Sequence, residues 1–265
     1  VVNALPTMVS IGVSPTTMCA GAVLSLTGNG AAGAGSLIRY NWSGPASYTS
    51  TTTTPVQLYT VPASSASGSY SVTATYTGTG CTSNPVASTA VTVNPLPTVY
   101  NITGGGFYCS GEPGVVVGLE NSDTGISYQL YNGASADGVP MAGTGAALDF
   151  GLKTAAGTYS VIATNNTTAC TTPMGNTTVV SVGPVPTQYA VTGGGGYCAG
   201  GAGVSVGLAN SDVSVGYQLY RDGVEVGSIV SPATAGPFSF GTFTATGTYT
   251  VKANPTATCN RNMSG

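Results

Sequence analysis

The chain has 265 residues with a formal net charge of −3, from five Lys or Arg and eight Asp or Glu, and it contains no His. So few cations leave no electrostatic footprint for nucleic acid. The longest apolar runs, such as residues 114–119, are far shorter than the roughly 20 residues that span a bilayer. We therefore expect neither nucleic-acid binding nor membrane insertion, and the 40 Gly residues favour short strands joined by turns.

Residues 1–7 are predicted to be the remnant of a strand and a linker. Val1 and Val2 match the end of a strand, and residues 2–7 (VNALPT) resemble residues 93–98 (VNPLPT) and 182–187 (VGPVPT). The chain begins with neither Met nor a signal peptide, so we expect it to be part of something longer. The linkers recur about every 90 residues and predict three domains, at 8–97, 98–186 and 187–265.

Each repeat contains apolar segments in which every second residue is apolar, which is the period of a strand. One segment follows the first Cys of the repeat, one has Tyr at its centre, and one begins Gly-x-Tyr-x-Val. A final strand closes the first two repeats. In chain order the segments are 24–26, 38–42, 70–74 and 91–93, then 115–119, 126–130, 159–163 and 180–182, then 204–208, 215–219 and 249–253.

About seven short strands in about 90 residues, separated by Gly, Asn and Pro, are typical of an immunoglobulin-like β-sandwich. The predicted fold is therefore all-β, with three such domains in tandem. Proline in the linkers favours extended backbone, so the domains are expected to form an elongated rod. Other all-β folds stay open, although a propeller blade is shorter and a β-helix repeats at a finer period.

Six cysteines fall two to a repeat, and the two are almost equally far apart in all three repeats. This spacing predicts a disulfide within each repeat, in an oxidising compartment, with each bond closing a loop that stabilises its domain by roughly 4 kcal/mol. The alternative is six unpaired thiols; zinc is disfavoured because His and Cys-x-x-Cys are both absent. The predicted pairs are Cys19 with Cys81, Cys109 with Cys170 and Cys198 with Cys259.

The sequence predicts no catalytic residue, cofactor or metal site. The absence of His removes the commonest general base, and the carboxylates lie mostly in turns of different repeats. Asp123 and Asp212 occupy matching Asn-Ser-Asp turns, where a turn role is favoured over calcium because no further acidic cluster accompanies them. The glycine tracts 104–106 and 193–196 lack the following helix of a phosphate loop, and positive φ angles or a bulge are expected there.

The string from Gly194 through Tyr197 and Cys198, continued by 203–208 and 217–220, resembles the immunoglobulin-like repeats of giant surface proteins of Bacteroidota. Residues 247–265 fit the same family, and repeat one matches it loosely because residues 14–19 (SPTTMC) replace its glycine tract. The resemblance implies export by the type IX route and a role in gliding adhesins or other repetitive surface fibres.

Repeat three stops at Gly265, before the strand that closes the other repeats, and Val1 and Val2 match the end of that strand. An unpaired sheet edge is an aggregation hazard, so we expect something to complete it. Either the following residues of a longer chain supply the strand, or a neighbouring subunit donates it. Val1, Val2, Met263 and Gly265 are the residues at these complementary ends.

The composition and repeats favour a structural or adhesive extracellular fibre or surface stalk, without catalysis. Its expected partners are copies of itself or neighbouring repeats, and surface glycans or other cells. The alternative is a carbohydrate-binding accessory region of a large secreted enzyme, which a row of exposed aromatic rings would favour. Trp42 is expected in the core because it replaces Leu130 and Leu219 at the inward register, whereas Tyr131 and Tyr220 face outward.

Overall fold

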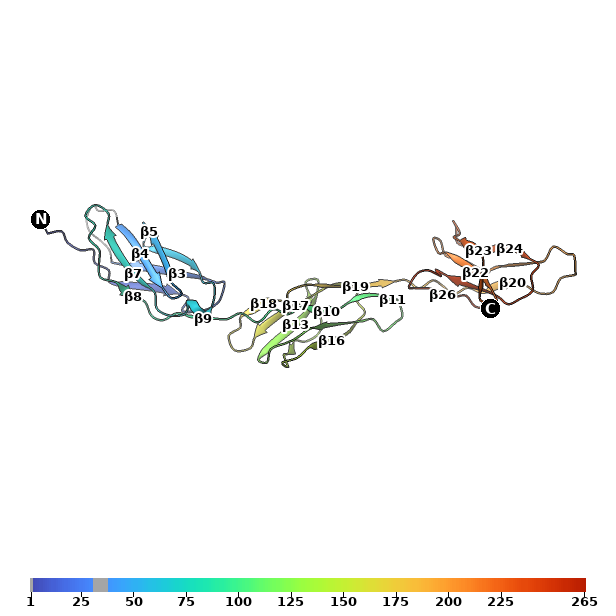
Figure 1. Cartoon of the computed structure of the whole chain (residues 1–265), viewed down its shortest axis with the longest axis horizontal. Coiled ribbons are helices and arrows are strands. Elements are labelled where there is room, and N and C mark those ends of the chain that lie inside the picture. The colour runs from blue at the N-terminus through green and yellow to red at the C-terminus, as the bar shows by residue number, and fades with distance from the viewer. Residues whose placement is uncertain (1, 31–37) are drawn as a thin grey trace.

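The computed structural model describes residues 2–30 and 38–265, so residue 1 and residues 31–37 lie outside the description. Its strands form three groups that follow one another along the long axis of an elongated chain (Figure 1). We call these groups domain 1 (β1–β9), domain 2 (β10–β19) and domain 3 (β20–β26). Within the described ranges, no helix has the length and apolar composition needed to cross a membrane.

Domain 1 packs a three-stranded sheet against a four-stranded sheet. The first has the order β1(Ser10–Ser14), β3(Val23–Asn29), β6(Val56–Thr60), and the second has the order β5(Tyr48–Thr52), β4(Ile38–Gly44), β7(Ser71–Tyr76), β8(Val86–Ala87). A short parallel pair, β2(Thr17–Cys19) with β9(Thr92–Asn94), closes one end. The 3₁₀ turn Ser64–Ala66 precedes β7.

Domain 2 repeats this arrangement with a more continuous second sheet. Its first sheet has the order β10(Ile102–Gly104), β12(Val115–Leu119), β16(Leu148–Lys153). Its second has the order β11(Gly106–Cys109), β19(Thr178–Gly183), β17(Gly157–Asn165), β13(Ile126–Asn132), β14(Ser135–Ala136), with β15(Met141–Ala142) on β13 and β18(Thr171–Pro173) on β17.

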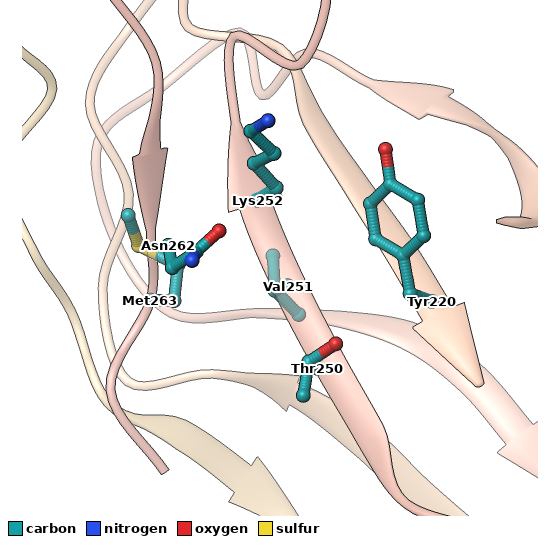
Figure 2. Close-up of a pocket in the computed structure, with 6 residues that line it drawn as sticks. All are labelled: Tyr220, Thr250, Val251, Lys252, Asn262 and Met263. Atoms are coloured by element: carbon teal, nitrogen blue, oxygen red, sulfur yellow. The ribbon is translucent and has the colours of Figure 1, made fainter. Parts of the chain in front are cut away.

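Domain 3 has the same two sheets without a described counterpart of β11 or β19. The first has the order β20(Val191–Gly193), β21(Val204–Leu208), β24(Phe238–Phe243), and the second has the order β23(Val224–Val230), β22(Tyr217–Arg221), β25(Tyr249–Ala253), β26(Arg261–Asn262). Figure 2 shows Thr250 and Lys252 of β25 between Tyr220 of β22 and Asn262 of β26.

The core of each domain is built from alternate residues of its strands, as the sequence period predicted. In β7 every second residue is buried, and Trp42 on the neighbouring β4 is 2% exposed, so its predicted place in the core is confirmed. Its indole Nε1–H donates to Thr52 Oγ1 at 2.9 Å. The sandwich fold of the three domains is therefore the predicted immunoglobulin-like one.

A tyrosine near the start of the same strand in every domain fixes the corner that precedes it. The hydroxyl of Tyr70 donates to the carbonyl of Ala66 at 2.8 Å. Tyr159 and Tyr249 make the same bond to the residue four positions earlier, each at 2.9 Å. A Tyr that bonds back to the backbone before this strand is a hallmark of immunoglobulin-like sandwiches.

The glycine tracts lie where the chain passes from one sheet of the sandwich to the other. In domain 2, β10 pairs with the first sheet and β11 with the second, and Gly104–Gly106 between them all have positive φ. A Cβ at Gly104 would overlap the carbonyl of Val116, so only glycine fits. In domain 1 the chain makes the same change of sheet between Ser14 and Thr17, where Pro15 and Thr16 replace the tract.

We predict that Tyr70→Phe lowers the unfolding free energy of domain 1 by about 1 kcal/mol, the usual net value of one hydrogen bond. Trp42 is the only Trp of the chain, so urea unfolding followed by its fluorescence reports on this domain alone. Tyr59→Phe, in β6 of the same domain, is the matched control, because no hydrogen bond of its hydroxyl is described. An unchanged midpoint for Tyr70→Phe would contradict the structural role of the corner.

The comparison of wild type with Tyr70→Phe also gives a prediction for how the unfolding free energy depends on pH. Burial raises the pKa of Tyr70 to about 12, above its value of about 10 in an unfolded chain. The stability that depends on the protonated phenol is therefore complete below about pH 10 and is lost as the pH rises toward 12. The difference in unfolding free energy between wild type and Tyr70→Phe should shrink over this range.

Candidate functional site

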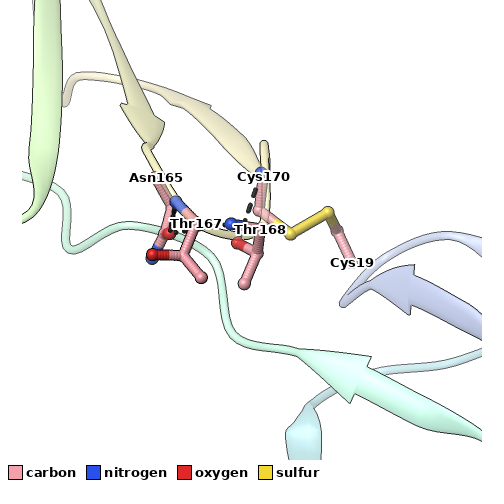
Figure 3. The surroundings of a disulfide bond; sticks show 5 residues. All are labelled: Cys19, Asn165, Thr167, Thr168 and Cys170. Carbon is pink, nitrogen blue, oxygen red and sulfur yellow. Dashed lines mark hydrogen bonds between the residues drawn. A yellow bond between two sulfur atoms is a disulfide. The ribbon is translucent and has the colours of Figure 1, made fainter.

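Two disulfides cross the joints between domains. Cys19 of domain 1 bonds to Cys170 of domain 2 (Figure 3), and Cys109 of domain 2 bonds to Cys259 of domain 3. Cys81 and Cys198 have no disulfide partner among the described residues. The predicted pairing within each repeat is therefore wrong, for Cys19 with Cys81, Cys109 with Cys170 and Cys198 with Cys259 alike.

Pairing within a domain fails because its two cysteines lie at opposite ends of the sandwich. Cys109 ends β11 beside Gly183, at the end of domain 2 where β17 begins. Cys170 follows the far end of β17, a nine-residue strand that spans about 30 Å. The observed disulfides join Cα atoms 5.6 and 5.5 Å apart, and a disulfide cannot bridge the length of a strand.

The cysteine spacing could not distinguish disulfides within a repeat from disulfides between consecutive repeats. The observed pairs are 151 and 150 residues apart, which is as regular as the spacing of the predicted pairs. Any fixed repeat gives constant separations for pairs within repeats and for pairs between consecutive repeats. The informative signal was strand direction: the first Cys lies at the exit of the domain, and the second follows a strand that runs back to its entrance.

The first cysteine of each joint is held by the strand that leads out of its domain. Cys19 pairs in parallel with Asn94 of β9, and Cys109 pairs in the same way with Gly183 of β19. The next amides, of Ala20 and Ser110, donate to the carbonyls of Asn94 and Gly183, each at 2.9 Å. The strand that closes the sandwich therefore also positions the thiol against the next domain.

The second cysteine of the first joint, Cys170, lies in a tight loop. Asn165 Oδ1 accepts the amides of Thr167 and Thr168 at 2.9 and 3.0 Å, and the amide of Asn165 donates to the carbonyl of Cys170 at 2.9 Å (Figure 3). Ala169 completes the loop with a φ of 58°. These bonds hold the backbone of the loop that carries Cys170.

The linkers attach to the next domain through tyrosines. Tyr100 donates its hydroxyl to Asp123 Oδ1 at 2.7 Å, and Tyr189 donates to Asp212 Oδ1 at 2.6 Å. The amide of Thr187 also donates to Asp212 Oδ2 at 3.1 Å. Asp123 and Asp212, predicted to serve turns, thus anchor the linkers as they enter domains 2 and 3.

The hydrogen bond of this anchor shifts the pKa values of both its groups. The hydrogen bond from Tyr189 lowers the pKa of Asp212, and the amide of Thr187 acts in the same direction against partial burial. The same bond raises the pKa of the Tyr189 phenol. Each joint therefore has two connections: the polypeptide linker with its Tyr–Asp anchor, and the disulfide.

Domain 3 has an open sheet edge where domain 2 has β11 and β19. Tyr197 is 39% exposed, whereas its counterpart Tyr108 is 7% exposed. Tyr249 is half-buried, whereas Tyr159 is fully buried. The buried core of domain 3 contains seven residues against thirteen in domain 2, so part of it is uncovered.

Apolar side chains border a hollow of about 200 Å³ along this edge. Tyr197, Val204, Phe243 and Tyr249 line it together with three glycines, Ala245 and Thr246. In domain 2, β19 occupies the corresponding place, and its Val180 is 1% exposed. The hollow therefore lies where domain 2 has a strand with a buried valine.

The residues predicted at the two complementary ends lie in different settings. Met263 is 6% exposed, and its amide donates to Val251 at 2.8 Å, so it belongs to the core of domain 3. Gly265 lies beside Val191. Val2 is fully exposed, and Val1 lies outside the described residues.

A second hollow of about 460 Å³ lies on the outer face of domain 3 (Figure 2). Tyr220, Lys252 and Asn262 are among the side chains that line it. Tyr220 is its only aromatic ring and the pKa of its phenol is raised, first by burial and then by Glu225. A row of aromatic rings, the feature that would favour sugar binding, does not line this hollow.

Comparison with known proteins gives a structural likeness alone. No family model and no curated protein matches the sequence. The chain is similar to a marsupial T cell receptor (13% identity, 97% of this chain and 100% of that one, TM-score 0.37) and to the chicken CNTN1 FN1-FN3 domains (13%, 97% and 98%, 0.27). It is also similar to three N-terminal domains of the outer capsid protein Hoc of bacteriophage RB49 (17%, 94% and 90%, 0.31). The chain is an array of immunoglobulin-like β-sandwiches, and this class rests on its own sheets and tyrosine corners.

We predict that backbone amides at the open edge exchange at least about tenfold faster than their paired counterparts. Tyr108 and Cys109 lie in a parallel pair with β19, whereas Tyr197 and Cys198 are in no described strand. Unpaired backbone exchanges from the native state without unfolding of the domain. Hydrogen exchange followed by mass spectrometry can compare the two Tyr-Cys segments, and equal protection would show that the edge of domain 3 is covered.

The double variant Cys19→Ser/Cys170→Ser should bend at the first joint without unfolding. Each core belongs to one domain, so the Trp42 unfolding midpoint should change little, while small-angle scattering should give a shorter and broader distribution of lengths. Cys81→Ser/Cys198→Ser removes the same number of cysteines without breaking a described disulfide and is the control, and both variants are measured as monomers isolated by size-exclusion chromatography. Identical scattering from both variants would show that the linker alone sets the joint.

Proposed function

We propose that this chain is part of a structural or adhesive extracellular fibre or surface stalk that works without catalysis. The observation that carries the proposal is the double connection at both joints, a linker and a disulfide between the same two domains. A single flexible linker lets neighbouring domains move independently, whereas two separate attachments restrict bending and twisting. Such joints suit a molecule that has to stay extended.

The same bonds support an extracellular location. Disulfides persist in oxidising compartments and are rare in the cytosol. The resemblance of residues 194–208 and 217–220 to repeats of Bacteroidota surface proteins supports export and display at the cell surface. We propose the domain boundaries 8–97, 98–186 and 187–265, with partners that are further repeats, surface glycans or other cells.

Carbohydrate binding in a secreted enzyme is the weaker alternative. The hollow in Figure 2 presents one aromatic ring, from Tyr220, among three polar and two aliphatic side chains. It lies on the side of domain 3, where a ligand would not explain why both joints are cross-linked. The fibre accounts for the joints directly.

Antibodies against domain 1, used on cells that make the protein, test the proposal. We expect labelling of intact cells that disappears after protease treatment of the surface, and extended rods in electron micrographs of the released material. Labelling only after permeabilisation would contradict it. Strong binding of the chain to a glycan array, lost in Tyr220→Ala and kept in Tyr131→Ala, would favour the carbohydrate-binding alternative.

A further inference from the structure

Cys81 and Cys198 occupy the positions that form disulfides elsewhere in the chain. In each observed joint, the first cysteine of one domain bonds to the second cysteine of the next. Cys198 is the first cysteine of domain 3, and Cys81 is the second cysteine of domain 1. A partner for Cys198 at the observed separation of 150 residues would lie beyond the 265 residues of this chain.

Cys198 is presented in the same turn as the two cysteines that lead a joint. The amide three positions after the cysteine donates to its carbonyl in all three domains: Gly201 to Cys198 at 2.9 Å, Glu112 to Cys109 at 3.0 Å and Ala22 to Cys19 at 3.2 Å. A glycine with positive φ follows each cysteine by two residues, at Gly21, Gly111 and Gly200. Cys198 differs in that it is exposed.

Cys81 is presented in the same loop as Cys170. The amide of Tyr76 donates to the carbonyl of Cys81 at 3.0 Å, as Asn165 does to Cys170 at 2.9 Å. The amide of Cys81 lies 3.4 Å from Thr79 Oγ1, and that of Cys170 lies 3.5 Å from Thr168 Oγ1. Gly80 and Ala169 precede the two cysteines with φ of 72° and 58°.

Residues 2 and 3 match in sequence the strand residues that lie beside the first cysteine of domain 1. Val2 and Asn3 are both exposed, and they correspond in sequence to Val93 and Asn94. In domain 1 those two residues pair in parallel with Met18 and Cys19, and Val93 is 3% exposed. Val2 and Asn3 of a second copy would pair in the same register with Tyr197 and Cys198.

The number of residues between the closing strand and the next second cysteine is also similar in the observed joints and in a joint between copies. The stretch from Val93 to Cys170, the second cysteine of domain 2, is as long as the stretch from Val182 to Cys259 in domain 3. The stretch from Val2 to Cys81 is only slightly longer than these. A copy whose Val2 pairs with Tyr197 would thus carry Cys81 to the place that the second cysteine occupies in the observed joints.

We propose that two copies of this chain join head to tail through a disulfide from Cys198 of one copy to Cys81 of the other. Val2 and Asn3 of the second copy lie along Tyr197 and Cys198 of the first. The proposal rests on the proposed fibre and names its partner and its bond.

The bond forms by thiol–disulfide exchange with a small-molecule disulfide such as glutathione disulfide. The Cys198 thiolate attacks one sulfur of that disulfide, the S–S bond breaks, and one glutathione thiolate leaves. The Cys81 thiolate then attacks Cys198 Sγ in the mixed disulfide and displaces the second thiolate. Two protein thiols are oxidised, two glutathione thiols are formed, and the two protons from the protein are taken up by them.

Two complementary variants test the joint with the full chain. Cys81→Ser keeps Cys198, and Cys198→Ser keeps Cys81. In a glutathione redox buffer each variant alone should stay monomeric, their mixture should form a disulfide-linked dimer and nothing larger, and wild type should form a ladder on a non-reducing gel. Mass spectrometry of the dimer should find the Cys198 peptide linked to the Cys81 peptide.

Homodimers of Cys81→Ser through Cys198 would overturn the proposal, and so would a mixture that stays monomeric while both internal disulfides are intact. Val2→Asp in the copy that supplies Cys81 should slow dimer formation several-fold. Val139→Asp is its control, because Val139 is 82% exposed in domain 2. Equal rates for the two would overturn the strand pairing.

Failure here would be distinct from failure of the proposed fibre. If the chain stays monomeric in the redox experiment but cells are labelled at the surface, the proposed fibre stands and the proposed Cys198–Cys81 bond is wrong. If ladders form in the redox experiment but labelling is found only inside cells, the bond stands and the proposed extracellular fibre is wrong.

Discussion

A disulfide requires Cα atoms about 4.4–6.8 Å apart, and the two cysteines of each domain are separated by the length of a sandwich. This constraint decides how the chain is connected. Cys109 stands where domain 2 ends and Cys170 where it begins, so each can reach only a cysteine of the adjoining domain. The disulfides therefore fasten domains to one another and leave each core to hold itself together through its alternating strands and its tyrosine corner.

The closing strand of each sandwich links the core to the joint. β19 places Val180 in the core of domain 2, pairs in parallel with the segment that carries Cys109, and continues into the linker. The glycine tract before β11 lets the chain change sheets so that this parallel pair can form. Where no closing strand is described, in domain 3, the core is smaller and Tyr197 and Cys198 are exposed. The completeness of a domain and the state of its exit cysteine thus depend on one strand.

Much of the fold could be predicted from the sequence, because strand periodicity and the recurrence of linkers are local patterns. The strands 70–74, 159–163 and 249–253 and the inward Trp42 were predicted and are confirmed. Of the positive φ angles or bulge expected in the glycine tracts, positive φ angles are present at Gly104–Gly106 and Gly193–Gly195. The cysteine partners were predicted wrongly, because partner choice depends on which end of the sandwich each cysteine occupies. Constant spacing along the sequence does not show which end of the sandwich a cysteine occupies. The anchors at Asp123 and Asp212 were missed for a similar reason, since Tyr100 and Tyr189 lie 23 residues before them and only the folded linker brings them together.

Disulfide mapping of the full chain tests the central claim most directly. The protein would be alkylated without reduction, digested, and analysed by mass spectrometry for cross-linked peptides. Links from Cys19 to Cys170 and from Cys109 to Cys259 are the result expected from joints that are cross-linked between domains. Links from Cys19 to Cys81, from Cys109 to Cys170 or from Cys198 to Cys259 would contradict it, because each would require the two ends of one sandwich to meet.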